Sequence, residues 1–310
     1  MVTLNSYKIG VDGGGTKTEL ILVDAAGAIV TQYLAAGCNP SQIGPDQARR
    51  ILLEGLASLL AKAKIEDLKA KVSAIHLYMA GSPDFWSEVA GDLTEYGAVL
   101  TAPDSGPVLE LATAGEPGLV LHAGTGSFVI TRAPDGFVHY TGGLGWKFGD
   151  PGSGFDLGRR ALALALLELQ ATAPLSATRP SPLAEALVNH TGLRDYAANS
   201  RYFYTDPSAN ATITSFAPRV LLLAEQDCGP AQQVVADSIT ELARLADGVI
   251  HKYFPGTTAK IPCGISGRIL NSAAGVFALR SLADKLAWSA ELNFITTPPI
   301  EGVRRLLMKS

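Results

Sequence analysis

Residues 11–24, VDGGGTKTELILVD, place an aspartate and three successive glycines between two apolar runs. The runs at 7–12 and 17–23 have the length and composition of β-strands, and a turn at 24–27 leads to a third expected strand at 28–34. The pattern predicts a meander of three strands with the glycines in its first turn. Alone, this turn is consistent with an ordinary hairpin.

The same pattern returns at 118–143, GLVLHAGTGSFVITRAPDGFVHYTGG, as strand, glycine-rich turn, strand, Asp-Gly turn and strand. Here GTGS at 124–127 takes the place that GGGT at 13–16 has in the first meander. Chance is one explanation, because glycine-rich hairpins are common. A matched pair favours a duplicated unit, so we expect two similar lobes, each with a helix-covered sheet and a glycine turn facing a shared cleft.

Length and composition describe a folded protein. The chain has 310 residues, of which 47% are apolar and 17% charged. One hydrophobic core seldom serves so long a chain, so we expect two lobes of roughly 100 to 200 residues each. The formal net charge is −4 with no block of like charges, which disfavours nucleic acid and anionic membranes as partners. No apolar run approaches the roughly 20 residues that span a bilayer, and we expect a cytoplasmic location.

The cysteines and histidines give no sign of a metal centre. Cys38, Cys228 and Cys263 lie far apart, and none belongs to a C-x-x-C pair. The five histidines are also scattered, with no spacing that would put two of them on one metal ion. We therefore expect no structural metal site.

Helical spacing and helix start signals predict the other elements. A strand is expected at 72–80, between helices at 45–63 and 84–96. After the second meander, a helix at 154–170 precedes a Pro/Ser/Thr-rich link at 172–182. The remaining expected helices lie at 183–190, 217–226, 230–253, 273–287 and after Pro299.

The glycine turns have the chemistry of an anion site. Glycine lacks a Cβ and tolerates positive φ, so such a turn can bring backbone N–H groups directly against a ligand. The hydroxyls of Thr16, Thr125 and Ser127 add hydrogen-bond donors, and Lys17 adds positive charge if it points inward. Phosphate is the ligand that this chemistry favours.

Asp12 narrows that interpretation. A carboxylate beside phosphates repels them unless a divalent cation lies between, and Mg2+ needs only one or two carboxylates. The combination predicts a magnesium nucleotide, with Asp12 as the anchor of the metal. The segment matches neither G-x-x-x-x-G-K-[ST] nor G-x-G-x-x-G, which disfavours P-loop and Rossmann sites.

These residues resemble the sugar kinase, actin and heat-shock chaperone superfamily, whose two phosphate loops match 12–16 and 124–127. DGGGTKT at 12–18 is similar to the branch that joins N-acetylglucosamine and glucosamine kinases to BadF/BadG/BcrA/BcrD-type ATPases. A third segment, GGLGWKFGDPGSG at 142–154 followed by LGRRAL at 157–162, looks like further motifs of those amino-sugar kinases.

The resemblance implies an α/β fold, a two-lobed actin-like ATPase made of duplicated ribonuclease H-like domains. Each domain would hold a mixed five-stranded sheet flanked by helices, with the nucleotide in the interlobe cleft. The N-terminal lobe would comprise 1–106 plus 298–310, and the C-terminal lobe 107–297. The resemblance also implies a homodimer formed through the second lobe.

Site residues follow from the same resemblance. A catalytic base follows the last strand of the first lobe in this family, and Asp104 matches by position. The residue type agrees, because a carboxylate ahead of a helix could accept a hydroxyl proton, although an ordinary N-cap is the alternative. Sugar contacts match Asn39, Asp104, Ser127, Gly143, Gly145 and Asp150. ATP contacts match Gly13, Gly14, Gly15, Thr16, Lys17, Gly124, Thr125, Gly126, Ala224, Gly264 and Gly267, with Mg2+ at Asp12, held through water.

We therefore expect ATP-dependent phosphorylation of an amino sugar, N-acetylglucosamine or glucosamine, at its 6-hydroxyl, with Asp104 as general base. The choice between these sugars stays open, because Leu144 stands where the family usually has tryptophan. One alternative is a non-catalytic sensor of sugar or nucleotide. Another is an ATPase that activates a dehydratase, which the cysteine pattern disfavours because that use needs a cysteine-held iron–sulfur cluster.

Overall fold

The computed structural model describes residues 6–172 and 180–309. Most of the link expected at 172–182 lies outside these residues. The chain divides into two compact units, unit 1 with residues 1–115 and 297–310, and unit 2 with residues 116–296. None of the helices in the described part is both long and apolar enough to cross a membrane.

Unit 1 is built on a five-stranded mixed sheet with the order β3-β2-β1-β4-β5. β1 pairs antiparallel with β2 and parallel with β4, as the expected meander and crossover require. The strands are β1 (Tyr7–Gly13), β2 (Lys17–Val23), β3 (Ile29–Ala36), β4 (Val72–Met79) and β5 (Ala98–Pro103). The helices are α1 (Pro40–Ile43), α2 (Pro45–Ala63), α3 (Leu68–Lys71), α4 (Pro83–Gly91), α5 (Gly106–Thr113) and α12 (Pro299–Lys309).

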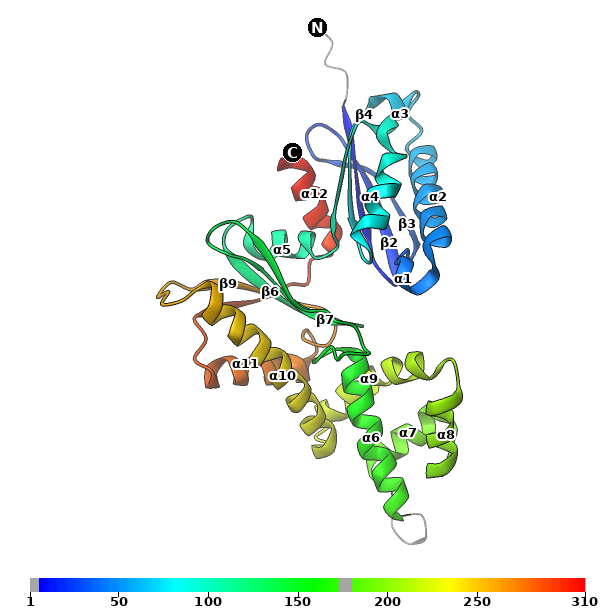
Figure 1. The fold of residues 1–310 in the computed structure, drawn as a ribbon, viewed down its shortest axis with the longest axis vertical. Coiled ribbons are helices and arrows are strands. Elements are labelled where there is room, and N and C mark those ends of the chain that lie inside the picture. Colours follow the sequence, from blue (N-terminus) through cyan, green and yellow to red (C-terminus); the bar gives the residue numbers. More distant parts are fainter. Residues whose placement is uncertain (1–5, 173–179, 310) are drawn as a thin grey trace. The chain divides into compact units, whose positions relative to one another are not determined.

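Both faces of this sheet are covered. Alternate residues of β1, Ile9 and Val11, are buried in a core with α2 and α4, while the opposite face packs against α12 (Figure 1). The contact with α12 is close, because a Cβ added at Gly10 would lie 2.4 Å from Cγ1 of Val303. α12 therefore joins the C-terminal end of the chain to the first strand.

Unit 2 repeats the same topology. Its sheet has the order β10-β9-β6-β7-β8, with β6 antiparallel to β7 and parallel to β9. The strands are β6 (Gly118–Ala123), β7 (Ser127–Arg132), β8 (Val138–Gly142), β9 (Ile261–Ser266) and β10 (Ala290–Phe294). The helices are α6 (Gly154–Thr172), α7 (Pro182–Thr191), α8 (Tyr196–Thr205), α9 (Ala209–Glu225), α10 (Gly229–Tyr253) and α11 (Ala273–Lys285). The predicted duplication and the predicted pair of mixed five-stranded sheets are confirmed.

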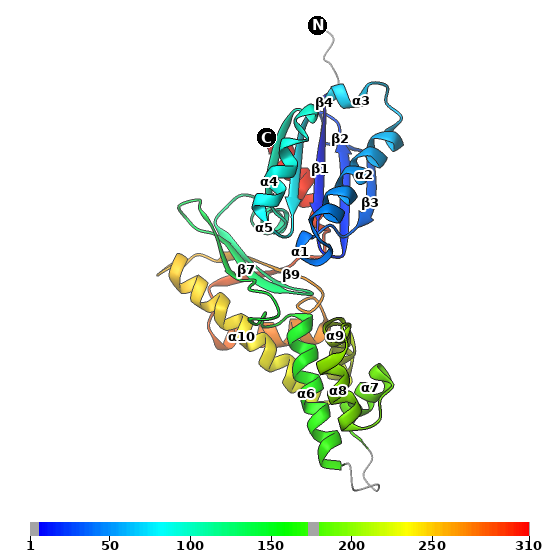
Figure 2. The same ribbon diagram turned by 45° about the vertical axis from the view of Figure 1, so that its right-hand side comes forward.

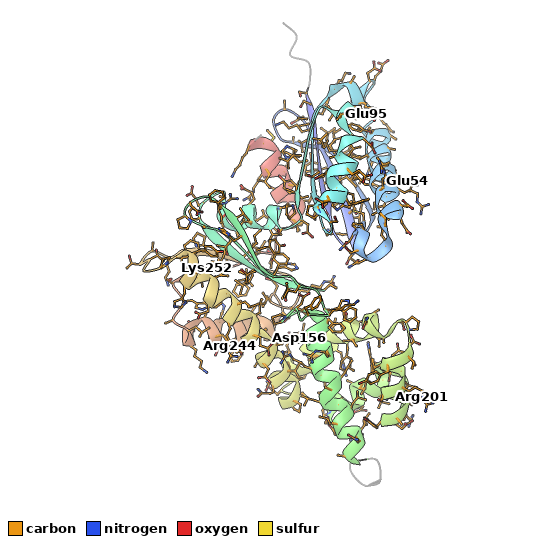
Figure 3. All side chains as sticks on the ribbon, viewed as in Figure 1. Glu54, Glu95, Asp156, Arg201, Arg244 and Lys252 are labelled. Atoms are coloured by element: carbon orange, nitrogen blue, oxygen red, sulfur yellow. The ribbon has the colours of Figure 1, made fainter. Side chains whose placement is uncertain are left out.

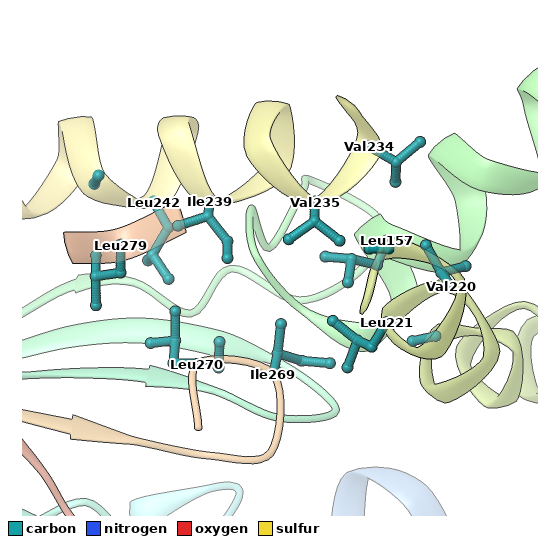
Figure 4. Close-up of a cluster of buried hydrophobic side chains, with 14 of the residues drawn as sticks. Leu157, Val220, Leu221, Val234, Val235, Ile239, Leu242, Ile269, Leu270 and Leu279 are labelled. Carbon is teal, nitrogen blue, oxygen red and sulfur yellow. The ribbon is translucent and has the colours of Figure 1, made fainter. Parts of the chain in front are cut away.

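The core of unit 2 lies on one face of its sheet, where α10 and α11 pack (Figures 1 and 2). Val235, Ile239, Leu242 and Ala246 recur on α10 at the spacing of one helix face, and all four are buried. Figure 4 shows three of them beside Ile269, Leu270 and Leu279. This hydrophobic layer packs against β6 and β9.

Three boundaries differ from expectation. α4 ends at Gly91, and Thr94–Tyr96 forms a separate 3-10 turn where one helix to 96 was predicted. α9 starts at Ala209, eight residues before the predicted start at 217. The prediction was wrong because Pro218 lies inside this helix, whereas proline in a sequence usually marks the first turn of a helix. The unit boundary falls after Gly115, whereas the sequence placed the lobe boundary after residue 106.

Packing against the last helix explains why α5 belongs to unit 1. A Cβ at Gly302 would lie 2.1 Å from the carbonyl oxygen of Pro107, so α12 and α5 are in backbone contact. Lys309 adds a hydrogen bond of 2.9 Å to the Ala114 carbonyl and an ion pair with the buried Glu110. These contacts join residues almost 200 positions apart, so local patterns do not reveal them.

Candidate active site

The first glycine turn lies between β1 and β2. The Gly14 amide donates to the Lys17 carbonyl, and neighbouring segments hold the turn through the bonds Cys38 N to Gly14 O and Ala80 N to Gly13 O. Within the described residues, the amides of Gly15 and Thr16 donate no hydrogen bond. Free backbone donors at a turn suit an anion.

Close packing, and not positive φ, accounts for the first glycine of this turn, Gly13. Gly13, Gly14 and Gly15 are absent from the positive-φ glycines of the described chain. A Cβ at Gly13 would lie 2.5 Å from Cε of Met79 and 3.0 Å from Sγ of Cys38. Of the two properties of glycine, its tolerance of positive φ is not used in this turn, and the missing Cβ provides space at Gly13.

Two acidic side chains of unit 1 influence each other beside this turn. Asp12 lies near the end of β1 and Asp104 directly follows β5. Burial, then the neighbouring charge of Asp104, raises the pKa of Asp12 to about 7. Burial also raises the pKa of Asp104, although its carboxylate accepts hydrogen bonds from its own amide and that of Ser105. A site that disfavours two carboxylate charges favours a proton or a cation.

The donor chemistry at this pair fits Mg2+. A divalent cation would relieve the charge repulsion and the burial cost that raise the pKa of Asp12, and carboxylate oxygen is a ligand that Mg2+ prefers. Lys17 only partly balances this charge, because its ammonium forms an ion pair of 2.8 Å with Glu19 and is about half exposed. In this structure the Lys17 ammonium is paired with Glu19, and its contact with ATP stays a prediction.

The second glycine turn lies between β6 and β7 in unit 2. The Gly124 amide donates to the Gly126 carbonyl, and the Gly124 carbonyl accepts from the Gly154 amide at the start of α6. Within the described residues, the amides of Thr125 and Gly126 have no hydrogen-bond acceptor. The second turn thus repeats the free donors of the first.

The segment GISG at 264–267 runs directly beside this turn. Ile269 donates to the Ala123 carbonyl, and a Cβ at Gly267 would lie 2.2 Å from that same oxygen. Gly267 has φ of +88°, which favours glycine. The structure therefore places Gly267 beside the second turn, whereas Gly264 pairs with Val120 in the middle of β6.

Four predicted sugar contacts form one cluster in unit 2. The Gly143 amide donates to the Ser127 carbonyl, and the Gly145 amide donates to Oδ1 of Asp150 at 3.0 Å. The Ser127 hydroxyl donates to the Pro151 carbonyl at 2.6 Å. Burial raises the pKa of Asp150, and three backbone amides that bind its carboxylate oppose that rise. The cluster presents a buried, hydrogen-bonded carboxylate.

A second buried aspartate supports the loop that carries this cluster. Asp156 lies in the first turn of α6 (Figure 3) and accepts hydrogen bonds from Arg160 at 2.9 Å and from the Ser238 hydroxyl at 2.5 Å. Ser238 also accepts the amide of Gly152 at 3.0 Å. α10 thereby holds the loop two residues after Asp150. The sequence did not single out either residue, since 82 positions separate them.

Two other predicted site residues have local roles. Asn39 is the N-cap of α1, and its Oδ1 accepts the Ser41 amide at 3.0 Å, which is the turn role that its residue type favours. Ala224 is buried in the helical core of unit 2. No contact in the described residues ties Ala224 to a glycine turn, whereas Asn39 lies beside the first turn because Cys38 binds Gly14.

Two curated proteins are similar to about half of this chain. Over 169 residues, the chain is 28% identical to an N-acetylmuramic acid/N-acetylglucosamine kinase of Clostridium acetobutylicum, covering 52% of this chain and 53% of that protein. It is also 28% identical over 167 residues to an N-acetyl-D-glucosamine kinase of Dictyostelium discoideum, covering 48% and 51%. The chain thus spans about half the length of the curated relatives it matches.

A solved structure gives the same fold over the whole chain. A candidate N-acetylglucosamine kinase from Chromobacterium violaceum superposes with a TM-score of 0.72 at 24% identity, covering 98% of this chain and 99% of that one. A family model matches residues 9–303, which include both glycine turns, Asp104 and the Asp150 cluster. The chain belongs to the BadF/BadG/BcrA/BcrD ATPase family.

Proposed function

We propose that this protein is an ATP-dependent kinase that phosphorylates the 6-hydroxyl of an amino sugar, N-acetylglucosamine or glucosamine. The observation that carries the proposal is the buried Asp12 beside the partly buried Asp104, whose charge raises the pKa of Asp12 next to a turn with free backbone donors. Phosphoryl transfer needs both the carboxylates and the backbone donors, because it proceeds by positioning and charge stabilisation more than by covalent chemistry. The two relatives named as sugar kinases support the choice of acceptor.

Asp104 is the proposed general base. Burial raises the pKa of Asp104, which makes its carboxylate a stronger base than a solvent-exposed aspartate. The hydrogen bonds from its own and the Ser105 amide fix its orientation at the start of α5. From that position it would accept the proton of the sugar hydroxyl as the phosphoryl group transfers.

The other residues bind and orient the substrates in this proposal. The amides of the two glycine turns hold phosphate oxygens, together with Thr16 and Thr125, and Gly264 and Gly267 border the adenosine. Asp12 would hold Mg2+ through water, and the ion would supply positive charge to balance the polyphosphate. Asn39, Ser127, Gly143, Gly145 and Asp150 would contact the sugar.

The direct test is Asp104→Asn, which keeps size and hydrogen bonding but removes the base. We expect sugar-dependent ADP release to fall by about 10²- to 10⁴-fold, the usual contribution of general base catalysis. The affinity for ADP, measured by calorimetry, should stay within twofold of wild type. Full sugar turnover by the variant would refute the assignment of Asp104.

A non-catalytic sensor of sugar or nucleotide is the second candidate. It would bind ADP and sugar without turnover, so the ADP-release assay on the wild-type protein separates the two. The homodimer, the lack of nucleic-acid and membrane partners, and the cytoplasmic location stay predictions. Size-exclusion chromatography with light scattering tests the first of these.

A further inference from the structure

His122 stands on β6, two positions before Gly124, and has no role in the site described so far. Leu119, Leu121 and Ala123 of this strand are buried among the helices of unit 2. Side chains alternate between the faces of a strand, so His122 lies on the opposite face of the sheet. It therefore points away from the hydrophobic core at the end of the strand that carries the second turn.

Two contacts hold the imidazole in place. Its Nδ1 lies 2.9 Å from the hydroxyl of Ser266, the residue paired with it on β9. Its ring stacks on Phe128 of β7 with centroids 4.8 Å apart and planes 14° apart. A ring fixed at one nitrogen and on one face has a defined position for its other nitrogen.

That other nitrogen, Nε2, faces the second glycine turn. A Cβ added at Gly124 would lie 3.1 Å from it, closer than nearly all real contacts of a Cβ. No hydrogen bond to Nε2 is found within the described residues. Gly124 thus leaves space in front of a polar atom that lacks a partner, beside the free amides of Thr125 and Gly126.

The state of the ring suits hydrogen bonding and not ion pairing. Burial lowers the pKa of His122 to about 4, so the imidazole is neutral at pH 7 and carries one N–H. When Ser266 donates its hydroxyl hydrogen to Nδ1, the ring hydrogen resides on Nε2. A neutral donor then faces the turn.

The duplicated topology supports a ligand role at this position. In unit 1 the last ladder pair of β1 and β2 is Gly13 with Thr18, and Asp12 precedes it. In unit 2 the last pair of β6 and β7 is Ala123 with Ser127, and His122 precedes it. Asp12 and His122 therefore occupy equivalent places, each one residue before the end of the central strand.

We propose that His122 is a nucleotide-binding residue, whose Nε2–H donates a hydrogen bond to a phosphate oxygen of ATP or ADP, and that Ser266 positions it. This inference rests on the ATP site of the proposed function and adds a residue to it. The proposed geometry makes His122 a contact for the phosphates alone, with no role toward adenosine or the sugar.

Two amide substitutions separate the two ring nitrogens. In His122→Asn, the side-chain amide can replace Nδ1 toward Ser266 but cannot reach the position of Nε2. In His122→Gln, the longer amide can place a donor near the Nε2 position. We expect His122→Asn to weaken ADP binding about tenfold or more, as loss of a hydrogen bond to a charged group predicts, and His122→Gln to restore most of it.

Calorimetric titration of the full chain with ADP and with adenosine provides the readout. The affinity for adenosine should stay within twofold in every variant, because adenosine has no phosphates. His139→Asn is the matched control, since His139 is stacked on Tyr253 at 4.4 Å in the same unit, away from the turns. It should leave the affinity for ADP unchanged.

Three outcomes would overturn the proposal. The first is an affinity of His122→Asn for ADP equal to that of the wild type. The second is a loss of adenosine affinity as large as the loss of ADP affinity. The third is equal weakening of ADP binding by His122→Asn and His122→Gln. If His122→Asn does not fold, His122→Phe, which keeps the stacked ring without its nitrogens, should fold and show the same selective loss of ADP affinity.

Long-range ¹H–¹⁵N spectra test the position of the ring hydrogen. They should show hydrogen on Nε2 and a shift of that resonance when ADP binds. Hydrogen on Nδ1 in the complex would contradict the proposal.

The failure of the kinase proposal would look different. If no sugar stimulates ADP release while the His122 variants lose ADP affinity selectively, the sugar-kinase function is wrong and the phosphate contact stands. If sugar turnover occurs and the His122 substitutions do not change the affinity for ADP, only the proposed contact between His122 and phosphate is wrong.

Discussion

The two halves of the chain share a strand order but differ in what they place beside their glycine turns. Unit 1 puts the carboxylate of Asp12 one residue before the end of its central strand, and unit 2 puts the imidazole of His122 there. One side chain resists ionisation beside a second carboxylate, and the other is a neutral donor. The comparison teaches that a duplicated scaffold can place side chains of different chemistry at equivalent positions, an acid in one copy and a neutral imidazole in the other.

The largest effect should come from removing the titrating group of unit 1. The pKa of Asp12 rises from 3.8 in the unfolded chain to about 7 in the folded one, so the folded state retains the proton. Its contribution to stability is complete below about pH 4 and is lost as pH rises to about 7, by up to about 4 kcal/mol. Asp12→Asn cannot titrate and should not lose stability this way.

Urea unfolding of both proteins at pH 4 and pH 8, with EDTA present, measures this difference. We expect the fall in unfolding free energy between these pH values to be up to about 4 kcal/mol smaller in Asp12→Asn. Other groups titrate alike in the two proteins and cancel. If the unfolding free energy changes with pH in the same way in the wild type and in Asp12→Asn, the pKa of Asp12 is not raised. The contrast between an acid that resists ionisation in unit 1 and a neutral imidazole in unit 2 would then be wrong.

The next effect compares Gly267, which lies beside the second turn, with Gly15 of the first turn. At Gly267, φ is +88° and an added Cβ would lie 2.2 Å from the backbone oxygen of Ala123. At Gly15, an added Cβ would meet only the exposed side-chain amide of Gln42 at 2.7 Å, which can rotate away. Gly267→Ala should lower the unfolding free energy by at least about 2 kcal/mol, and Gly15→Ala by less than about 1 kcal/mol. Equal losses would show that the two sites are packed alike.

The smallest effect concerns the support of the Asp150 loop. Ser238→Ala leaves the amide of Gly152 with only a long contact of 3.5 Å to Oδ2 of Asp156, removes the hydroxyl that donates to Asp156, and costs about 1–3 kcal/mol of stability. If the loop positions the sugar, the KM for sugar should rise severalfold while the KM for ATP does not change. Thr240→Ala is the control, because its hydroxyl binds only the Ala236 carbonyl of the same helix. A matching rise in both KM values would indicate general loosening of the fold.

Local patterns in the sequence were enough to predict the parts of the fold that depend on neighbours in the chain. α2 begins at Pro45 and ends at Ala63 as predicted, because proline suits a first helical position and the apolar residues keep one face. The two meanders were also predicted from local patterns, short apolar runs separated by turn residues. β10 and α8 were missed, since β10 is a half-exposed strand at the edge of its sheet and α8 buries only Asn199.

The candidate site divides in the same way. The glycine turns, Asp104 and Asp150 lie in motifs and were found from the sequence. His122 and Ser266 were not, because 144 positions separate them and only the pairing of β6 with β9 brings them together. Ser238 and Asp156 likewise meet only through the packing of α10 on α6. Side chains that act through tertiary neighbours leave no local signal.

The central claim is that the two turns serve phosphoryl transfer to an amino sugar. ADP release by the wild-type protein with ATP and Mg2+ tests it directly, with glucosamine, N-acetylglucosamine, N-acetylmannosamine and glucose supplied in turn. The account predicts turnover with glucosamine or N-acetylglucosamine well above that with glucose, and a 6-phosphate product in the ³¹P NMR spectrum. ADP release that no sugar stimulates would contradict the account.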